Sequence, residues 1–328
     1  MSNGRDMFKG ATNNPAYEPR YSEIATFMRC PHKPDLKDVD IAIVGIPFDE
    51  ATGTRPGARF GPRALRDASI MTRQIHHVTR FNPYDSCRVA DGGDIRFNHI
   101  HNVEGCHTDI TSYVAGLVER GITPLFAGGD HSVTYPIVRA IGAERPVAIV
   151  HFDAHSDTVG EVRGSKFHHG CPFYLGVEEG FMVPEKIIQI GIRGTQNFAD
   201  QWDYPKDKGF RVVFIEEVYE LGIQGVIDEI HRVVGDMPVY LSFDIDAIDP
   251  AFAPGTGTPE IGGLLSREAQ QILRGCRGLD IVGADLVEVS PQWDPSDSTA
   301  LIGATLMYEI LCLLAEARLA RVSRGSAP

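Results

Sequence analysis

The feature that most constrains the fold is a regular alternation of short apolar runs with helical stretches. Seven runs rich in β-branched residues each end in glycine or an acidic residue: 40–46, 123–127, 147–152, 186–190, 211–215, 239–243 and 280–287. Between several of them lie stretches with helical patterning: 61–73, 103–120, 132–141, 224–234, 266–277 and 297–317. Continuous apolar strands that alternate with helices predict an α/β fold with a parallel sheet covered on both faces. In such sheets the ligand crevice lies beyond the carboxyl ends of the strands.

The chain of 328 residues contains no internal repeat and no Pro/Gly/Ser-rich stretch long enough to be an interdomain linker. We therefore expect a single catalytic domain over residues 39–320. Residues 1–38 are expected to form an N-terminal extension that packs on this domain or on a neighbouring subunit. Residues 321–328 are expected to form a flexible tail.

Composition excludes several classes of protein. A formal net charge of −13 argues against nucleic-acid binding, which needs a basic surface. The apolar stretch from Ala300 to Ala315 contains Glu309 and is too short to span a bilayer, so it predicts a buried helix and not a membrane anchor. No apolar run follows the first charged residues, which speaks against a secretory signal and for a cytoplasmic location. The six cysteines form no close pair, which predicts reduced, buried thiols.

Three segments place acidic and imidazole side chains where predicted strands end. In 126–131, two glycines allow a tight turn before Asp130 and His131. Segments 151–157 and 241–250 carry their candidates at alternate positions, which puts them on one side of an extended backbone. These candidates are Asp153, His155 and Asp157 in the first, and Asp244 and Asp246 in the second, with Asp249 before a proline that ends the strand.

So many carboxylates at neighbouring strand ends would repel one another if no cation lay between them. The alternative is a set of separately exposed turn residues and helix caps, but alternation buries one face and Asp is rarely buried without a partner. Oxygen and imidazole donors without cysteine suit manganese, iron, cobalt, nickel or zinc more than calcium, and the dominance of carboxylates favours manganese. The donors exceed what one catalytic ion needs, so we predict two ions with a bridging hydroxide.

At these residues the sequence resembles the ureohydrolase family of arginases, agmatinases and related guanidino-acid hydrolases. The family's signature elements stand as Gly-Gly-Asp-His-Ser at 128–132, Asp-Ala-His-Ser-Asp at 153–157 and Ser-Phe-Asp-Ile-Asp-Ala-Ile-Asp-Pro at 242–250. Segments 54–62, 91–94 and 288–291 extend the likeness, which runs from about residue 40 to 317. The resemblance implies a three-layer α/β/α domain around a mainly parallel eight-stranded sheet, assembled as a homotrimer or homohexamer.

The resemblance also implies the ligands of two Mn²⁺ ions per chain. One ion would be bound by His131, Asp153, Asp157 and Asp244, and the other by Asp153, His155, Asp244 and Asp246. These are the donors that the strand-end pattern selects.

Three further roles follow from the likeness. Asp157 is expected to hydrogen-bond the nucleophilic hydroxide and to pass its proton to the leaving nitrogen, in addition to or in place of plain metal ligation. His169, in Phe-His-His-Gly at 167–170, aligns with the family's proton-carrying histidine, a role that suits a pKa near 6.5. We expect His168 to be a surface or packing residue. Glu288 resembles the glutamate that binds the substrate guanidinium through two parallel hydrogen bonds, the alternative being an ordinary strand-end glutamate.

The expected reaction is hydrolysis of agmatine to putrescine and urea, with a guanidino acid, 4-guanidinobutyrate or 3-guanidinopropionate, as the alternative substrate. Arginine is disfavoured, because the stretch 158–167 is short and lacks the asparagine-rich pattern of arginine-specific members. Segments 173–180 and 188–194 look most like the agmatinase branch, although Leu175-Gly176 replaces the commoner Arg-Ala.

The charge of the substrate tail is not decided by the sequence. The ammonium group of agmatine would suit Glu178 or Glu179, whereas a carboxylate would suit Arg163, Lys166 or Arg193. Two other classes of protein are weighed as well. A single-zinc deacylase of the same broad fold would not need His131, Asp157 and Asp246, and a non-catalytic scaffold would be expected to have lost part of the ligand set.

Overall fold

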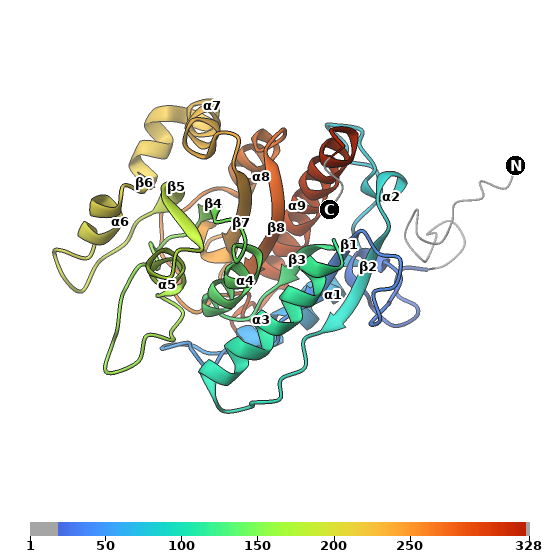
Figure 1. Cartoon of the computed structure of the whole chain (residues 1–328), viewed down its shortest axis with the longest axis horizontal. Helices are drawn as coiled ribbons and strands as arrows, with labels where there is room; N and C mark the ends of the chain where they lie inside the picture. Colours follow the sequence, from blue (N-terminus) through green and yellow to red (C-terminus); the bar gives the residue numbers. More distant parts are fainter. Residues whose placement is uncertain (1–18, 326–328) are drawn as a thin grey trace, which may run out of the picture.

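The computed structural model describes residues 19–325, and its centre is one twisted sheet (Figure 1). Within these residues the strand order is β2-β1-β3-β8-β7-β4-β5-β6, and every neighbouring pair is parallel. The strands are β1 (Ile41–Gly45), β2 (Val89–Asp94), β3 (Thr123–Ala127), β4 (Val147–Phe152), β5 (Met182–Ile192), β6 (Arg211–Phe214), β7 (Pro238–Asp244) and β8 (Asp280–Val287). The predicted parallel α/β fold is confirmed.

Helices cover both faces of this sheet and complete three layers (Figure 1). On one face, apolar side chains of the strands pack against α3 (Val103–Glu119), α4 (Thr134–Ile141) and α5 (Pro172–Glu178). On the other face they pack against α1 (Gly61–Ser69), α7 (Ile215–Val234), α8 (Ser266–Gly275) and α9 (Ser298–Ser323). Two short helices, α2 (Pro83–Ser86) and α6 (Asp203–Lys208), lie in connections. Single 3₁₀ turns are η1 (Phe27–Arg29), η2 (Ala58–Phe60), η3 (His131–Val133), η4 (Ile245–Ala247) and η5 (Pro291–Trp293).

Helix α9 is the buried helix that the sequence predicts. It is the one helix among the described residues that is long and apolar enough to cross a membrane, but 78% of its most apolar window is buried inside the protein. Buried side chains of α9 belong to the same apolar cluster as those of α1, α7 and α8. A helix enclosed in this way is a core helix, because lipid-facing residues would have to stay uncovered.

The described part of the predicted N-terminal extension, residues 19–38, packs on β2 and α1 of the same chain. The backbone N–H of Phe27 donates to Asp91 Oδ2 at 2.9 Å, and the Arg66 guanidinium lies 4.2 Å from the centre of the Phe27 ring. Asp91 also accepts a hydrogen bond from Arg66 at 2.9 Å. Residues 1–18 of the expected extension and 326–328 of the expected tail lie outside the described residues, and α9 continues through Ser323.

The sheet order brings the chemically interesting segments together. Strands β3, β8, β7 and β4 are consecutive neighbours in the middle of the sheet, and their carboxyl ends lead into the three metal-ligand segments and Glu288. The candidate site therefore lies at the carboxyl edge of the central strands, as parallel α/β sheets lead one to expect.

A candidate metal centre at the carboxyl edge of the sheet

Two glycines set the position of the first ligand segment. A Cβ atom on Gly129 would lie 1.7 Å from the backbone oxygen of Phe48, and one on Gly128 would lie 2.5 Å from Val287 Cγ1. Only a residue without a side chain allows β3 to end this close to the backbone after β1 and to the end of β8. The approach is fixed by hydrogen bonds from the Asp130 N–H to Phe48 O at 2.8 Å and from the Glu288 N–H to Gly129 O at 2.9 Å.

A first group of donors converges around His131. Its Nδ1 atom lies 3.1, 3.0 and 3.2 Å from carboxylate oxygens of Asp153, Asp157 and Asp244, respectively. Yet Nδ1 makes no hydrogen bond of acceptable geometry and is fully enclosed. Four lone-pair donors that point at one spot without hydrogen-bonding one another are what a divalent cation needs.

A second group stands beside the first and shares Asp153 with it. His155 Nδ1 lies 3.3 Å from Asp153 Oδ1 and 3.1 Å from Asp246 Oδ2. The other oxygen of Asp153, Oδ2, is the one near His131. Asp153 thus offers one oxygen to each group, so it could serve both groups if each held an ion.

Electrostatics supports the fit of this set to cations. Burial together with the charges of Asp246 and Asp153 raises the pKa of Asp244 well above its usual range. Burial and the charge of Asp153 raise the pKa of Asp246 to about 6. Both shifts oppose ionisation of the carboxyls, and a positive charge among them would relieve this cost. The donor set, with oxygens and imidazole nitrogens and no cysteine, fits hard or borderline divalent metals.

His151, which sequence reasoning did not select, lies at the same centre but is held as a hydrogen-bond donor. It is fully buried within reach of His131 and Asp153, and its Nε2 lies 2.8 Å from Asp153 Oδ2. The amide nitrogen of Gln189 donates both to Ser156 O at 2.6 Å and to His151 Nδ1 at 3.0 Å. Because Nδ1 is an acceptor, the ring proton is on Nε2 and points at Asp153. His151 therefore orients the bridging carboxylate and has no lone pair left for a metal.

A second chain of hydrogen bonds fixes the ring of His131 through its other nitrogen, Nε2. His131 Nε2 lies 2.9 Å from Ser242 Oγ, and that hydroxyl donates to Asp285 Oδ1 at 2.6 Å. The hydroxyl groups of Thr134 and Tyr240 each donate a hydrogen bond to Asp285 Oδ2 at 2.7 Å. Because the Ser242 hydroxyl donates its hydrogen bond to Asp285, it accepts a hydrogen bond from His131 Nε2–H. The proton of the neutral His131 ring is therefore on Nε2, and Nδ1 keeps a lone pair that can bind a cation.

Asp130 is not part of either donor group. Its carboxylate accepts from the Ser132 hydroxyl at 2.6 Å and N–H at 3.0 Å and from the Ala51 N–H at 3.0 Å. Burial and the charge of Glu288 raise its pKa to about 7. Asp130 caps η3 and fixes the loop that follows β1, which is the structural role that its place before Ser132 allows.

One side of the centre is formed by Glu288, His169 and Asp157. Glu288 Oε1 accepts from the His131 N–H at 2.9 Å and lies 3.0 Å from His169 Nδ1, whereas Oε2 is buried without a partner. Burial opposes the charged imidazole, but the hydrogen bond and charge of Glu288 outweigh it and raise the pKa of His169 to about 9. Glu288 and Asp157 both have left-handed backbone, at φ 63° and 48°. Such strain in residues that are not glycine is typical of functional sites.

A cavity of about 160 Å³ opens beside these groups. Its lining consists of His155, Ser156, Asp157, Val159, His169, Gly170, Gln196, Gln201, Asp244 and Thr258. Among the described residues that line it, the acidic ones are Asp157 and Asp244, which both belong to the first donor group. His168 points elsewhere, with Nε2 2.9 Å from Gly160 O, in keeping with its expected packing role.

Four of the five charged residues expected to bind the substrate tail are engaged in contacts of their own, and the fifth, Arg163, is exposed. Glu178 pairs with Lys208 at 2.7 Å, and Glu179 accepts from the Tyr135 hydroxyl at 2.8 Å. Lys166 lies 3.9 Å from Glu179. The Arg193 guanidinium donates six hydrogen bonds to backbone carbonyls of Gly191, Asp246, Ala247, Glu260 and Ile261. Arg193 therefore fixes the backbone around Asp246 instead of facing the cavity.

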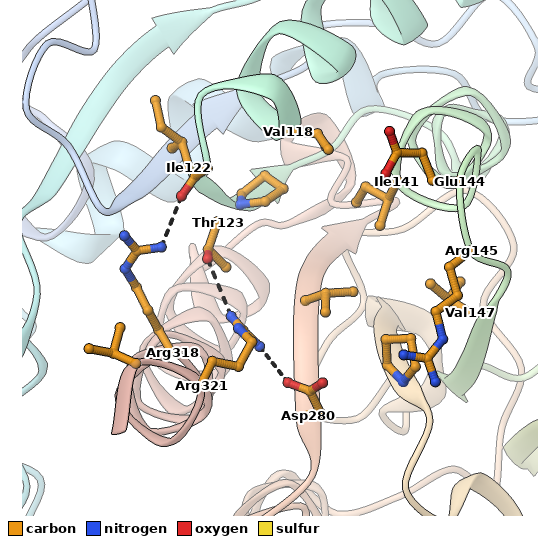
Figure 2. Close-up of a pocket in the computed structure, with 15 residues that line it drawn as sticks. Val118, Ile122, Thr123, Ile141, Glu144, Arg145, Val147, Asp280, Arg318 and Arg321 are labelled. Carbon is orange, nitrogen blue, oxygen red and sulfur yellow. Dashed lines mark hydrogen bonds and ion pairs between the residues drawn. The ribbon is translucent and has the colours of Figure 1, made fainter. Parts of the chain in front are cut away.

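A larger cavity, of about 480 Å³, lies at the opposite edge of the sheet (Figure 2). It is lined near the amino ends of strands by Thr123, Val147 and Asp280, with Arg318 and Arg321 of α9 along one side. Both arginines are held by protein partners, Arg318 by Gly121 O at 2.9 Å and Arg321 by Asp280 at 2.7 Å. Because this cavity holds no cluster of metal-ligand side chains, size alone does not identify the reactive site, and the smaller cavity at the donor groups is the candidate.

Comparisons with known proteins bear on the same residues. A model of the arginase family matches residues 39–313. The guanidinopropionase of Pseudomonas aeruginosa is 50% identical over 299 residues, which cover 91% of this chain and 94% of that protein. A mitochondrial agmatinase of Gallus gallus is 46% identical over 89% of this chain and 86% of its own. The solved structure of the proclavaminate amidino hydrolase of Streptomyces clavuligerus is 42% identical and superimposes with a TM-score of 0.88, over 92% of this chain and all of that one.

Proposed function

The chain belongs to the arginase family, and from that membership we propose that it hydrolyses a linear guanidino acid to urea and an amino acid at a centre of two divalent cations. The family expected from the sequence motifs is thereby confirmed, and with it a metal-dependent hydrolase acting on guanidino compounds. The substrate, the metal and the role of each site residue are proposals.

One observation supports the proposal most directly. Glu288 holds a buried carboxylate oxygen, Oε2, that has no hydrogen-bond partner, next to the donor groups around His131. An unpaired buried carboxylate oxygen is costly, and the cost is recovered when a ligand donates to it. A guanidinium is the ligand that matches a carboxylate best, because its planar N–H fork supplies charge and direction together.

We propose that His131, Asp153, Asp157 and Asp244 hold one cation and that Asp153, His155, Asp244 and Asp246 hold the other. Manganese is proposed because carboxylate oxygens outnumber imidazole nitrogens among these donors. A divalent cation, when bound, lowers the pKa of coordinated water so that a nucleophile is present at neutral pH.

The chain's own residues would bind the substrate and move protons. Glu288 Oε2 would accept from the guanidinium and hold its carbon towards the centre, with the strained backbone of Glu288 fixing the direction of the side chain. Asp157, whose side chain is 12% exposed at the cavity, would hold a proton and deliver it to the leaving nitrogen. His169, kept protonated at neutral pH by Glu288, would exchange protons between the cavity and solvent.

The choice of a guanidino acid over agmatine depends on the charges at the cavity. Glu178 and Glu179, the acidic residues that would suit an ammonium tail, have partners of their own. Apart from the first donor group, no acidic side chain lines the cavity among the described residues. The relative at 50% identity is a guanidinopropionase, which favours the same substrate class. Agmatine, the substrate expected from the sequence, is the second candidate, favoured by the 46% identical agmatinase.

The test is urea release by the manganese-loaded protein from 4-guanidinobutyrate, 3-guanidinopropionate, agmatine, arginine and guanidine. We expect one of the two guanidino acids to have the highest kcat/KM. A clear preference for agmatine would overturn the substrate class but keep the chemistry, and no urea from any compound would overturn both. Metal analysis of the same protein separates the proposal from a single-zinc deacylase, because we expect two ions per chain.

Two expectations from the sequence concern the protein outside its site. A homotrimer or homohexamer stays a prediction, which light scattering of the metal-loaded protein would test. A cytoplasmic location also stays a prediction, which cell fractionation would test.

A further inference from the structure

A loop between β1 and α1 lies against the substrate side of the centre. Ala51 O accepts from the His169 N–H at 3.2 Å, and the Gly53 N–H lies 3.5 Å from His169 Nε2. The Ala51 N–H donates to Asp130 Oδ2 at 3.0 Å. These contacts fix the loop beside His169, the proposed proton carrier, which lines the cavity.

Gly257 lies between the next residues of this loop and the free oxygen of Glu288. The position that a Cβ atom would occupy on Gly257 lies 3.6 Å from Glu288 Oε2, 3.4 Å from Thr54 O and 3.6 Å from Arg55 O. The backbone of Thr54 and Arg55 therefore borders the same space beside Gly257 as the oxygen that we assign to the substrate guanidinium.

The Arg55 side chain has features of a group that awaits a ligand. Its guanidinium lies 4.5 Å from the centre of the Trp293 ring, which is 41% exposed. Its Nε atom is enclosed yet has no hydrogen-bond partner. Its backbone is left-handed, with φ 48°, a strained conformation for arginine. Stacking on an aromatic face leaves the in-plane N–H donors of a guanidinium open to a carboxylate.

Three other cations near the site are already engaged, whereas Arg163 is exposed. Arg59 forms an ion pair with Asp49, and Lys166 lies near Glu179. All six hydrogen bonds of Arg193 go to backbone carbonyls. Arg55, on the loop that contacts His169, forms no ion pair with any described carboxylate.

We propose that Arg55, held against Trp293, binds the carboxylate of the guanidino acid while Glu288 binds its guanidinium. This inference rests on the proposed function and adds the residue that selects an acidic tail. The substrate would lie with its ends between two opposite charges, separated by its two or three methylene groups. The carboxylate would accept two parallel hydrogen bonds from the Arg55 guanidinium, which would repel the ammonium of agmatine.

The experiment compares 4-guanidinobutyrate with n-butylguanidine, which has the same guanidinium and no tail charge. For Arg55→Met, which keeps a side chain that packs on Trp293, the ratio of kcat/KM for the acid over the neutral compound should fall about 10- to 100-fold, as expected for loss of a charge-assisted contact. The loss should appear mainly in KM. Arg55→Lys, which keeps the charge without the fork, should recover part of it. Arg145→Met, at an exposed arginine beside the larger cavity at the opposite edge of the sheet, is the matched control and should keep the ratio.

The outcomes separate this inference from the proposed function. If the wild-type protein prefers guanidino acids and Arg55→Met keeps that preference, Arg55 does not bind the tail and the proposed function stands. If both compounds lose kcat/KM equally, Arg55 only shapes the loop and the inference is overturned. If the wild-type protein prefers agmatine to both, the substrate class and this inference fail together.

Discussion

Glu288 and His169 form a pair in which one carboxylate oxygen is occupied and the other is free. His169 Nδ1 lies 3.0 Å from Glu288 Oε1, whereas Oε2 is buried without a partner. The occupied oxygen holds the imidazole charged, and the free oxygen faces the place proposed for the substrate. One side chain thus links substrate binding to proton transfer, so changes at Glu288 should affect both.

The first prediction concerns Glu288→Gln. The amide keeps the size of the side chain but loses its charge, so the guanidinium fork loses its partner and His169 loses the cause of its raised pKa. We expect kcat/KM to fall about 100- to 1,000-fold, while metal content stays near that of the wild type. Urea assays and metal analysis on the same preparation check this. Near-normal turnover would refute the role of Glu288, and loss of metal would point to a structural role instead.

The second prediction concerns the carboxylate behind His131. Asp285 accepts hydrogen bonds from the hydroxyl groups of Ser242, Thr134 and Tyr240. In Asp285→Asn the amide can no longer accept at both oxygens, so the Ser242 hydroxyl and the His131 tautomer lose their fixed direction. We expect metal affinity about 10- to 100-fold weaker, measured by titration of the metal-free protein with Mn²⁺.

The matched control is Thr134→Val, which removes one hydroxyl donor and leaves the Asp285 carboxylate in place. It should weaken metal binding much less than Asp285→Asn. Equal effects of the two variants would mean that packing around Asp285, and not the orientation of His131, determines metal affinity.

Much of the fold was predictable because the strands of a parallel sheet are buried on both faces. The runs at 123–127, 147–152 and 280–287 coincide with β3, β4 and β8. Strand β2 was not predicted, because Gly92 and Gly93 interrupt its apolar run. Helix α7 begins at Ile215, but it is kinked at Gly222, where φ is 65°, so the predicted helix over 224–234 covers only the part after the kink. Secondary structure is thus hard to predict from local sequence where a glycine lies in a strand at the edge of the sheet or at a helix kink.

The candidate site was predictable only where its residues stand in sequence motifs. The alternating acidic and imidazole residues of 153–157 and 244–246 do converge with His131. His151 stands at the alternate position before Asp153 but lies inside strand β4. Gln189 and Asp285, also polar residues inside buried strands, carry no such pattern. A buried polar residue in an otherwise apolar strand was the available signal, because such a residue needs a partner. Which partner it meets depends on strand order, which the sequence does not state.

The third prediction concerns Gly257, whose missing side chain leaves space beside the free oxygen. A Cβ atom there would lie 3.6 Å from Glu288 Oε2, an ordinary contact that should not disturb folding. It would, however, occupy part of the space where a guanidinium has to meet that oxygen. We expect Gly257→Ala to raise KM about tenfold or more, by the cost of overpacking, with metal content unchanged.

Gly116→Ala in α3 is the control for Gly257→Ala, because an added Cβ meets no atom within 4 Å there. It should leave KM at the wild-type value. If Gly257→Ala also does so, the guanidinium does not approach Oε2 from that side.

The last prediction concerns His107, a histidine that should make the protein sensitive to acid. It is 4% exposed among aromatic rings, with Phe167, Phe48 and Tyr135 at centroid distances of 5.5, 5.9 and 6.0 Å. Its Nε2 lies 3.1 Å from Ser132 Oγ, and Nδ1 has no partner. A second proton would therefore create a buried N–H without an acceptor, and burial lowers the pKa of His107 to about 4.

This folded-state pKa lies below the value of about 6.5 for an unfolded chain. The unfolded chain therefore takes up the proton first as the pH falls, so stability is lost as pH falls from about 6.5 to about 4. Between pH 7 and pH 5 the loss due to His107 should be about 2 kcal/mol. His107→Gln, which can still donate to Ser132 but does not titrate, should lack this part of the acid sensitivity. Urea unfolding at the two pH values gives the change in the free energy of unfolding for each protein. The metal ligands contribute equally to both proteins, so their effect cancels when the two changes are subtracted. If the wild-type protein and His107→Gln lose the same free energy of unfolding between the two pH values, burial of His107 does not cause the acid sensitivity.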